Sequence, residues 1–243
     1  MGTSALIHLA TDLGDSGLLL PVALVGVVLL WFLHSPRLSW VLLRSVLLAG
    51  VLIAALKILF LSCGARWVSG LVSPSGHACL SAVVYGAVAT LYAAGRPPPV
   101  RVLTGAVAVA FVAFISVTRV ALGVHTPLEV LVGLAVGGIA LAWFIHSCAQ
   151  LPPLRVGGGA LAMAMAVTVM FAFGVRLPVE SAIRHVARRV AFSCQAAAAA
   201  PVPAYRGGAG SVASRVSARA PAAAAPTCHS RNATSRAVSC RRW

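Results

Sequence analysis

The chain has 243 residues, of which 60% are hydrophobic and only 9% are charged. This composition excludes an ordinary soluble globular protein, because lipid must solvate most of such a chain. The formal net charge of +15 arises mostly from ten arginines that follow Glu180. Since no zinc-finger spacing or folded basic face accompanies these arginines, we expect no nucleic-acid partner. The six cysteines form no CxxC pair, which indicates separate thiols.

Long apolar runs predict an all-α, polytopic membrane helical bundle of about six transmembrane helices. The runs approach or reach the roughly 17 to 25 residues that span a bilayer. They cover residues 17–33, 38–56, 78–94, 102–117, 127–145 and 160–175. Between the second and third runs, residues 58–72 are expected to form a partly apolar loop. Three prolines between Gly95 and Arg101 should interrupt helical structure.

We therefore expect three parts along the chain, the first being a transmembrane domain over residues 1–176. Between residues 177 and 192, apolar side chains recur at helical spacing with Arg184, Arg188 and Arg189 between them. This pattern is typical of a basic amphipathic helix on a membrane surface. Residues 193–243 are dominated by Ala, Pro, Ser, Gly and Arg, and we expect a disordered tail because few large apolar side chains offset its ordering entropy.

Two short polar stretches, residues 73–77 and 118–129, interrupt the apolar runs. Consecutive membrane helices alternate in direction, so the ends of the second and fourth runs and the starts of the third and fifth share one face. Those places hold Lys57, His77, Arg119, His125 and Glu129. Ionisable groups are costly beside hydrocarbon, so their clustering is a functional-site hypothesis. The two helix N-termini there favour an anion, and we expect a phosphate site.

These side chains suit phosphoryl transfer, which needs neutralised oxygen charge, an in-line nucleophile and a proton for the leaving oxygen. Lys57 and Arg119 can neutralise the charge. One histidine can attack phosphorus while the other serves as general acid. Glu129, four residues after His125, can accept a hydrogen bond from its ring and fix the tautomer.

Both polar stretches also have a purely structural interpretation. The Ser75 hydroxyl and the Gly76 N–H can donate hydrogen bonds to phosphate, yet Ser-Pro-Ser-Gly is also a common turn and helix start. Residues 126–129 form a capping box with proline at the first helical position. Taken singly, the turn and the cap are sufficient explanations. For His77, Arg119, His125 and Glu129 as a set, chance is the poorer explanation.

Pro74-Ser-Gly-His77 and Arg119-x5-His125-x3-Glu129 resemble the second and third signature motifs of the type 2 phosphatidic acid phosphatase superfamily. Its members are integral membrane phosphatases that share a site with vanadium haloperoxidases. The resemblance covers roughly residues 10 to 150, with 41 residues between His77 and Arg119. It implies a six-helix fold and a phosphohistidine mechanism without metal or other cofactor. In that mechanism His125 is the nucleophile and His77 the general acid.

The superfamily's first motif, Lys-x6-Arg-Pro, is irregular in this chain. Lys57 is followed at the expected position by Gly64, and the nearest arginine is Arg66, with Trp67 after it. The resemblance makes Arg66 a candidate phosphate ligand. The irregularity leaves open an alternative, a polytopic anion-binding or transport protein without catalysis. A haloperoxidase-type vanadate enzyme is disfavoured because those enzymes are soluble.

The leading hypothesis is a phosphatase of membrane lipids, with undecaprenyl diphosphate, phosphatidic acid or phosphatidylglycerol phosphate as substrate and membrane lipids as surroundings. The expected location is a bacterial inner membrane. Loops on the side opposite the site carry Arg37, Arg44, Arg96, Arg101 and Arg155. By the positive-inside rule that side is cytoplasmic and the site is extracytoplasmic. Six spans would place the arginines of residues 177–192 outside, against the same rule.

Overall fold

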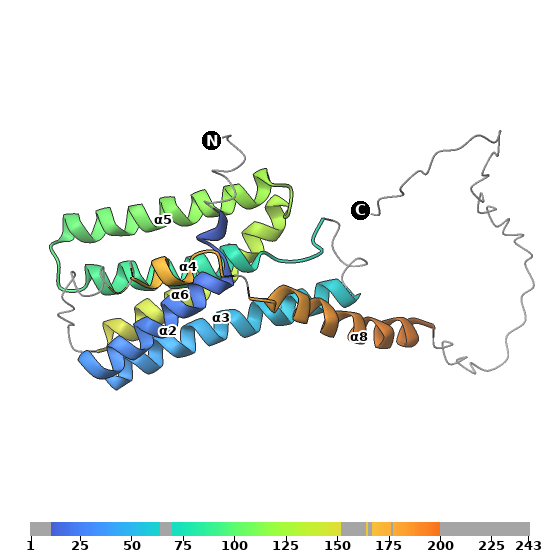
Figure 1. The fold of residues 1–243 in the computed structure, drawn as a ribbon, viewed down its shortest axis with the longest axis horizontal. Helices are drawn as coiled ribbons and strands as arrows, with labels where there is room; N and C mark the ends of the chain where they lie inside the picture. The colour runs from blue at the N-terminus through green and yellow to red at the C-terminus, as the bar shows by residue number, and fades with distance from the viewer. Residues whose placement is uncertain (1–10, 64–69, 152–163, 165–166, 176, 200–243) are drawn as a thin grey trace, which may run out of the picture. The chain divides into compact units, whose positions relative to one another are not determined.

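Caps and prolines set the helix boundaries in the computed structural model, which describes residues 11–63, 70–151, 164, 167–175 and 177–199. All of these belong to the first of the two units into which the chain divides, Met1–Ala200. The six long helices are α2 (Ser16–Leu33), α3 (Pro36–Cys63), α4 (Gly76–Ala93), α5 (Pro98–Ala121), α6 (Pro127–Ala149) and α8 (Val179–Ala199) (Figure 1). The part of the chain described is helical without strands, which confirms the predicted fold class.

Five helices, α2 to α6, are long and apolar enough to cross a membrane, judged by length and composition among the described residues. The sequence predicted about six. The additional run, residues 160–175, lies partly outside the described residues, although residues 167–172 are helical. Most of the expected disordered tail, residues 193–243, also lies outside them.

Three helix boundaries differ from the sequence prediction. The helix α5 begins at Pro98, inside the proline-rich stretch expected to be irregular, because proline is tolerated in the first helical turn. The helix α3 continues to Cys63, so Lys57 lies within a helix rather than at its end. The helix α8 continues past Phe192 to Ala199 through a run of alanines, which have the highest helix propensity.

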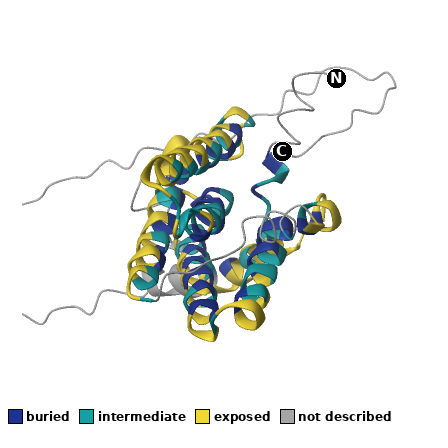
Figure 2. Ribbon diagram, turned by 90° about the vertical axis from the view of Figure 1, so that its left-hand side faces the viewer, coloured by how far each residue is buried: buried dark blue, intermediate teal, exposed yellow. Residues whose placement is uncertain are grey.

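The helix α4 is the centre of the bundle and contacts α2, α3, α5 and α6. Its inward residues include Cys79, Val83 and Ala87, none more than 1% exposed. Apolar side chains also cover the outer faces of the helices, and Phe32 and Val102 are 78% and 72% exposed. Figure 2 shows these exposed outer faces around buried inner ones. A surface of this kind suits contact with lipid tails.

Glycines bring the starts of α4 and α6 into close contact. A Cβ atom on Gly133 would collide with the carbonyl oxygen of Ser75, and one on Gly137 would collide with that of Cys79. Small residues let membrane helices approach closely in this way. The first turns of α4 and α6, which carry the two polar motifs, are therefore held side by side.

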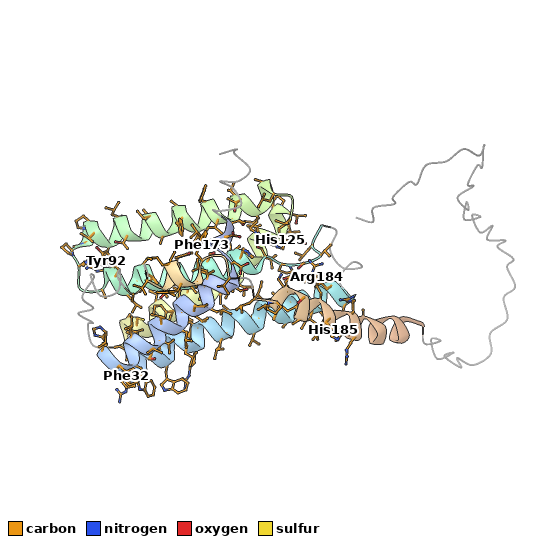
Figure 3. All side chains as sticks on the ribbon, viewed as in Figure 1. Phe32, Tyr92, His125, Phe173, Arg184 and His185 are labelled. Carbon is orange, nitrogen blue, oxygen red and sulfur yellow. The ribbon has the colours of Figure 1, made fainter. Side chains whose placement is uncertain are left out.

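The alternating directions of the helices bring the polar motifs to one end of the bundle. Figure 3 places His125 at this end and Phe32 and Tyr92 at the other. The starts of α2, α4 and α6 and the ends of α3 and α5 share the end that holds His125 (Figures 1 and 3).

Candidate active site

The carboxylate of Glu129 is the most highly connected group at this end. Its Oε2 lies 3.0 Å from Nδ1 of His125 and accepts from the N–H of Thr126 at 3.1 Å. Its Oε1 accepts from the N–H groups of Val72 and Ser73 at 2.9 and 2.7 Å. Only an ionised carboxylate offers enough acceptor sites for these four contacts without a donor of its own.

Glu129 therefore has both of the roles that the sequence left open. It closes a capping box with Thr126, whose hydroxyl accepts from the Glu129 N–H at 3.2 Å. The same side chain holds the His125 ring. Because Nδ1 is the nitrogen facing the carboxylate, Nδ1–H donates to Glu129 and Nε2 keeps its lone pair.

The environment of His125 favours the neutral imidazole. Burial lowers the pKa of His125; the hydrogen bond to Glu129 raises it, but the positive charges of Lys57 and Arg119 lower it further. The net shift is downward from the ordinary value. The neutral imidazole, which has an unprotonated nitrogen, therefore persists to a lower pH than in an ordinary histidine.

His77, in the first turn of α4, faces an acid that lies outside both sequence motifs. Its Nε2 lies 3.5 Å from Oδ2 of Asp15. Asp15 is the N-cap of α2, and its Oδ1 accepts from the Gly17 N–H at 2.7 Å. Gly14 packs beside the ring, since a Cβ there would lie 3.4 Å from Cδ2 of His77. The carboxylate of Asp15 can therefore accept a hydrogen bond from Nε2–H of His77 and orient its ring.

Arg119, near the end of α5, reaches across to the residues that precede α2. Its Nη1 donates to the hydroxyl of Thr11 at 3.0 Å. Among the residues that the structure describes, the Nε of Arg119 is buried without a hydrogen-bond partner. A phosphate oxygen is the kind of acceptor that such a guanidinium N–H takes. The charge of Arg119 acts on both His77 and His125, so one anion could lie near all three.

Lys57 is buried, with 4% of its side chain exposed, and points toward the start of α4. A Cβ on Gly76 would lie 3.9 Å from its Nζ, so the ammonium group approaches the first helical amides. Its Nζ also lies 2.5 Å from Oε2 of Glu180 in α8. This ion pair joins residues that lie 123 positions apart in the sequence, and Glu180 belongs to neither of the two polar motifs.

Ser75 and Arg66 are the remaining predicted phosphate ligands. The Ser75 side chain is the N-cap of α4 and accepts from the Ala78 N–H at 3.4 Å. Ser75 is 0% exposed, which favours its structural interpretation over direct contact with a ligand. Arg66 lies outside the described residues. The structure thus brings together His77, His125, Glu129, Lys57, Gly76 and Arg119, and adds Asp15, Thr11 and Glu180.

The donors at this end do not suggest a metal ion. Among the described residues, no three His, Cys, Asp or Glu side chains are grouped so that they could hold one. The charge that a divalent cation would supply to phosphate is available from Lys57 and Arg119 instead.

An all-helical bundle of apolar helices with imidazoles, cations and carboxylates at one end defines a polytopic membrane protein with a candidate anion site. Residues 38–152 match the family model described as the PAP2 superfamily. This segment is a PAP2 superfamily domain, in agreement with the two sequence motifs. It contains α4 to α6 and all of α3 except its first two residues, and it excludes α2 and α8. No curated protein and no solved structure matches the chain.

The PAP2 superfamily match over residues 38–152 and the five apolar helices together support an integral membrane protein. The matched segment includes every predicted catalytic and phosphate-binding residue. By contrast, Asp15 and Glu180, which contact His77 and Lys57, come from helices outside it.

Proposed function

We propose that this protein hydrolyses lipid phosphate or diphosphate monoesters in a membrane through a phosphohistidine intermediate. The observation that carries the proposal is the His125–Glu129 pair, in which the carboxylate holds Nδ1 at 3.0 Å and leaves Nε2 free. The adjoining cations Lys57 and Arg119 supply the charge that a phosphoryl group needs.

In the first step, Nε2 of His125 attacks phosphorus and the bond between phosphorus and the leaving lipid oxygen breaks. His77 donates a proton to that oxygen, and Asp15, whose Oδ2 lies 3.5 Å from Nε2 of His77, orients the ring. In the second step, water attacks the phosphohistidine, the phosphorus–nitrogen bond breaks and His77 takes a proton from the water. The products are an alcohol, or a lipid phosphate in the case of a diphosphate, and inorganic phosphate.

The position of the site suits a substrate anchored in lipid. Helices α2 to α6 are apolar enough to cross the bilayer, so their ends lie at the depth of lipid headgroups. Arg37, Arg96 and Arg101 lie in or beside the turns between α2 and α3 and between α4 and α5, at the opposite end. By the positive-inside rule, the site then faces the extracytoplasmic side, for example that of a bacterial inner membrane. Undecaprenyl diphosphate, phosphatidic acid and phosphatidylglycerol phosphate are the substrates proposed.

The test compares His125→Ala and His77→Ala on one lipid phosphate and one activated aryl phosphate, in detergent with EDTA. His125→Ala should abolish turnover of both substrates and prevent acid-labile phosphorylation of the protein. His77→Ala should spare the aryl phosphate far more than the lipid, because an activated leaving group needs no general acid. His146→Ala is a matched control, since His146 lies in the last turn of α6, at the far end of the bundle.

Equal loss on both substrates for His77→Ala would overturn its assignment as general acid. Wild-type protein that binds orthovanadate but releases no phosphate from any lipid would favour the alternative, an anion-binding or transport protein. The pairing of Lys57 with an internal carboxylate is the observation that keeps this alternative open.

A further inference from the structure

The first acidic residue of α8 lies against the candidate active site. Oε2 of Glu180 is 2.5 Å from Nζ of Lys57, and Oε1 is 3.3 Å from Nε of Arg184. Figure 3 shows Arg184 and His125 toward the same end of the bundle. Glu180 is one of only four acids in the chain, and it comes from a helix outside the PAP2 domain.

The charges around this carboxylate are those expected around a bound phosphate. Burial alone would raise the pKa of Glu180, but the hydrogen bond and charge of Lys57 outweigh it, with help from Arg184 and His125. The carboxyl group therefore ionises at a lower pH than usual. Arg119 also has a favourable charge–charge interaction with Glu180, although no direct hydrogen bond joins the two side chains among the interactions described.

We propose that Glu180 is an internal anion that occupies the phosphate position beside Lys57, so that a substrate phosphate must displace it. The inference rests on the proposed function for the identity of the displacing substrate. A buried ammonium group without a partner is costly, and Glu180 removes this cost when no phosphate is bound. The same contact weakens the binding of every competing anion, including the phosphate product, and so determines the affinity of the site.

The carboxylate can leave without the helix moving. The Glu180 side chain is 45% exposed, whereas that of Lys57 is 4% exposed, so the acid can rotate toward solvent. Arg184, four residues later, offers it a partner there. The helix α8 has separate attachments to α3, since Ala187 is buried and its carbonyl oxygen accepts from the Ser62 hydroxyl at 2.9 Å.

Direct competition between Glu180 and a bound anion predicts how replacing Glu180 should change the affinity for anions. If Glu180 competes for Lys57, then Glu180→Gln should strengthen the binding of any anion at this position by one common factor. Loss of a charge-assisted contact sets that factor at about tenfold. A residue that only positions Lys57 would instead weaken anion binding when it is replaced.

The experiment measures equilibrium binding of orthovanadate and of inorganic phosphate to the full chain in detergent, by calorimetry. Glu180→Gln should lower both Kd values by the same factor. Glu180→Ala should have the same effect and replaces the first variant if that variant is unstable. Arg188→Gln is the control, because Arg188 is an exposed cation of the same helix. In a Lys57→Met background, Glu180→Gln should change the Kd by less than about twofold, since its partner is gone.

Unchanged or larger Kd values in both Glu180 variants would overturn the inference. A decrease in Kd that persists in the Lys57→Met background would also overturn the inference. Binding does not require turnover, so a wild-type protein that binds orthovanadate but hydrolyses no lipid would contradict the proposed function and still allow this test.

Discussion

Glu129 shows how one side chain can serve structure and chemistry together. Its Oε1 accepts hydrogen bonds from the N–H groups of Val72 and Ser73 in the loop before α4, and its Oε2 accepts one from the ring of His125. Its main-chain oxygen also accepts from the Ser75 N–H at 2.9 Å. His125, the proposed nucleophile, and the start of the α4 helix are thus positioned by the same residue.

Replacing Glu129 with Gln should impair both roles. The amide of glutamine has only one oxygen. In either orientation, its NH₂ group therefore faces N–H groups that donate to the carboxylate in the wild-type protein. Leaving a buried donor unsatisfied costs about 1–3 kcal/mol, so we expect kcat to fall about 10- to 100-fold. Steady-state rates on a lipid phosphate check this, with exposed Gln150→Ala at the other end of α6 as control. Full activity of Glu129→Gln would reduce the residue to a helix cap.

The sequence could predict some residue contacts and not others. His125 and Glu129 lie four positions apart, so helical spacing and the capping-box pattern are enough to predict their contact. Asp15 contacts His77 from a turn of only a few residues that has no motif of its own. Glu180 meets Lys57 across 123 positions. Neither of these two contacts has a local signal, because both depend on how helices pack.

At the scale of the elements, the interface between α4 and α6 decides whether the two motifs meet. Gly133 and Gly137 lie on one face of α6, one helical turn apart, and oppose the backbone of α4. Gly138 is exposed, and a Cβ there would meet no atom within 4 Å. The adjacent glycines 137 and 138 therefore offer a matched pair of substitutions.

Gly137→Ala should destabilise the bundle and reduce activity. The new methyl group would collide with the carbonyl oxygen of Cys79, which cannot move without shifting α4 and with it His77. Overpacking of this kind costs about 1–3 kcal/mol. Gly138→Ala should leave activity unchanged and slightly raise stability, because alanine has the higher helix propensity. Thermal unfolding in detergent, with phosphate release, separates the two variants; equal behaviour would contradict the close-packing argument.

The apolar helices were predictable because each one is a continuous run of hydrophobic residues long enough to cross a bilayer. Since consecutive helices alternate in direction, the two motifs were then expected on one face. The sequence predicts that the second run ends at Lys57, since a lysine is typical of the edge of the hydrocarbon. The structure carries α3 on to Cys63, with Lys57 paired to Glu180. A buried charge that has a partner need not mark a helix end.

At the scale of the whole molecule, the PAP2 domain and the functional assembly do not coincide. The family match begins at residue 38 and ends at residue 152, whereas α2 and α8 each contribute an acid to the candidate site. A short helical stretch, residues 167–172, also packs against the core through Ala172. The minimal active chain should therefore extend from before Asp15 to beyond the residues by which α8 contacts α3.

The dispensable tail should begin later in the chain than its composition alone predicts. Composition placed it after Phe192, but α8 continues to Ala199, so the truncation to make is a stop codon after Ala199. The shortened protein should insert in the membrane and keep the full chain's kcat and orthovanadate Kd within about twofold, because the Lys57–Glu180 and Ser62–Ala187 contacts remain. Membrane fractionation, phosphate release and calorimetry measure the three properties. Normal insertion with loss of turnover would assign residues 200–243 a part in catalysis that their composition does not suggest.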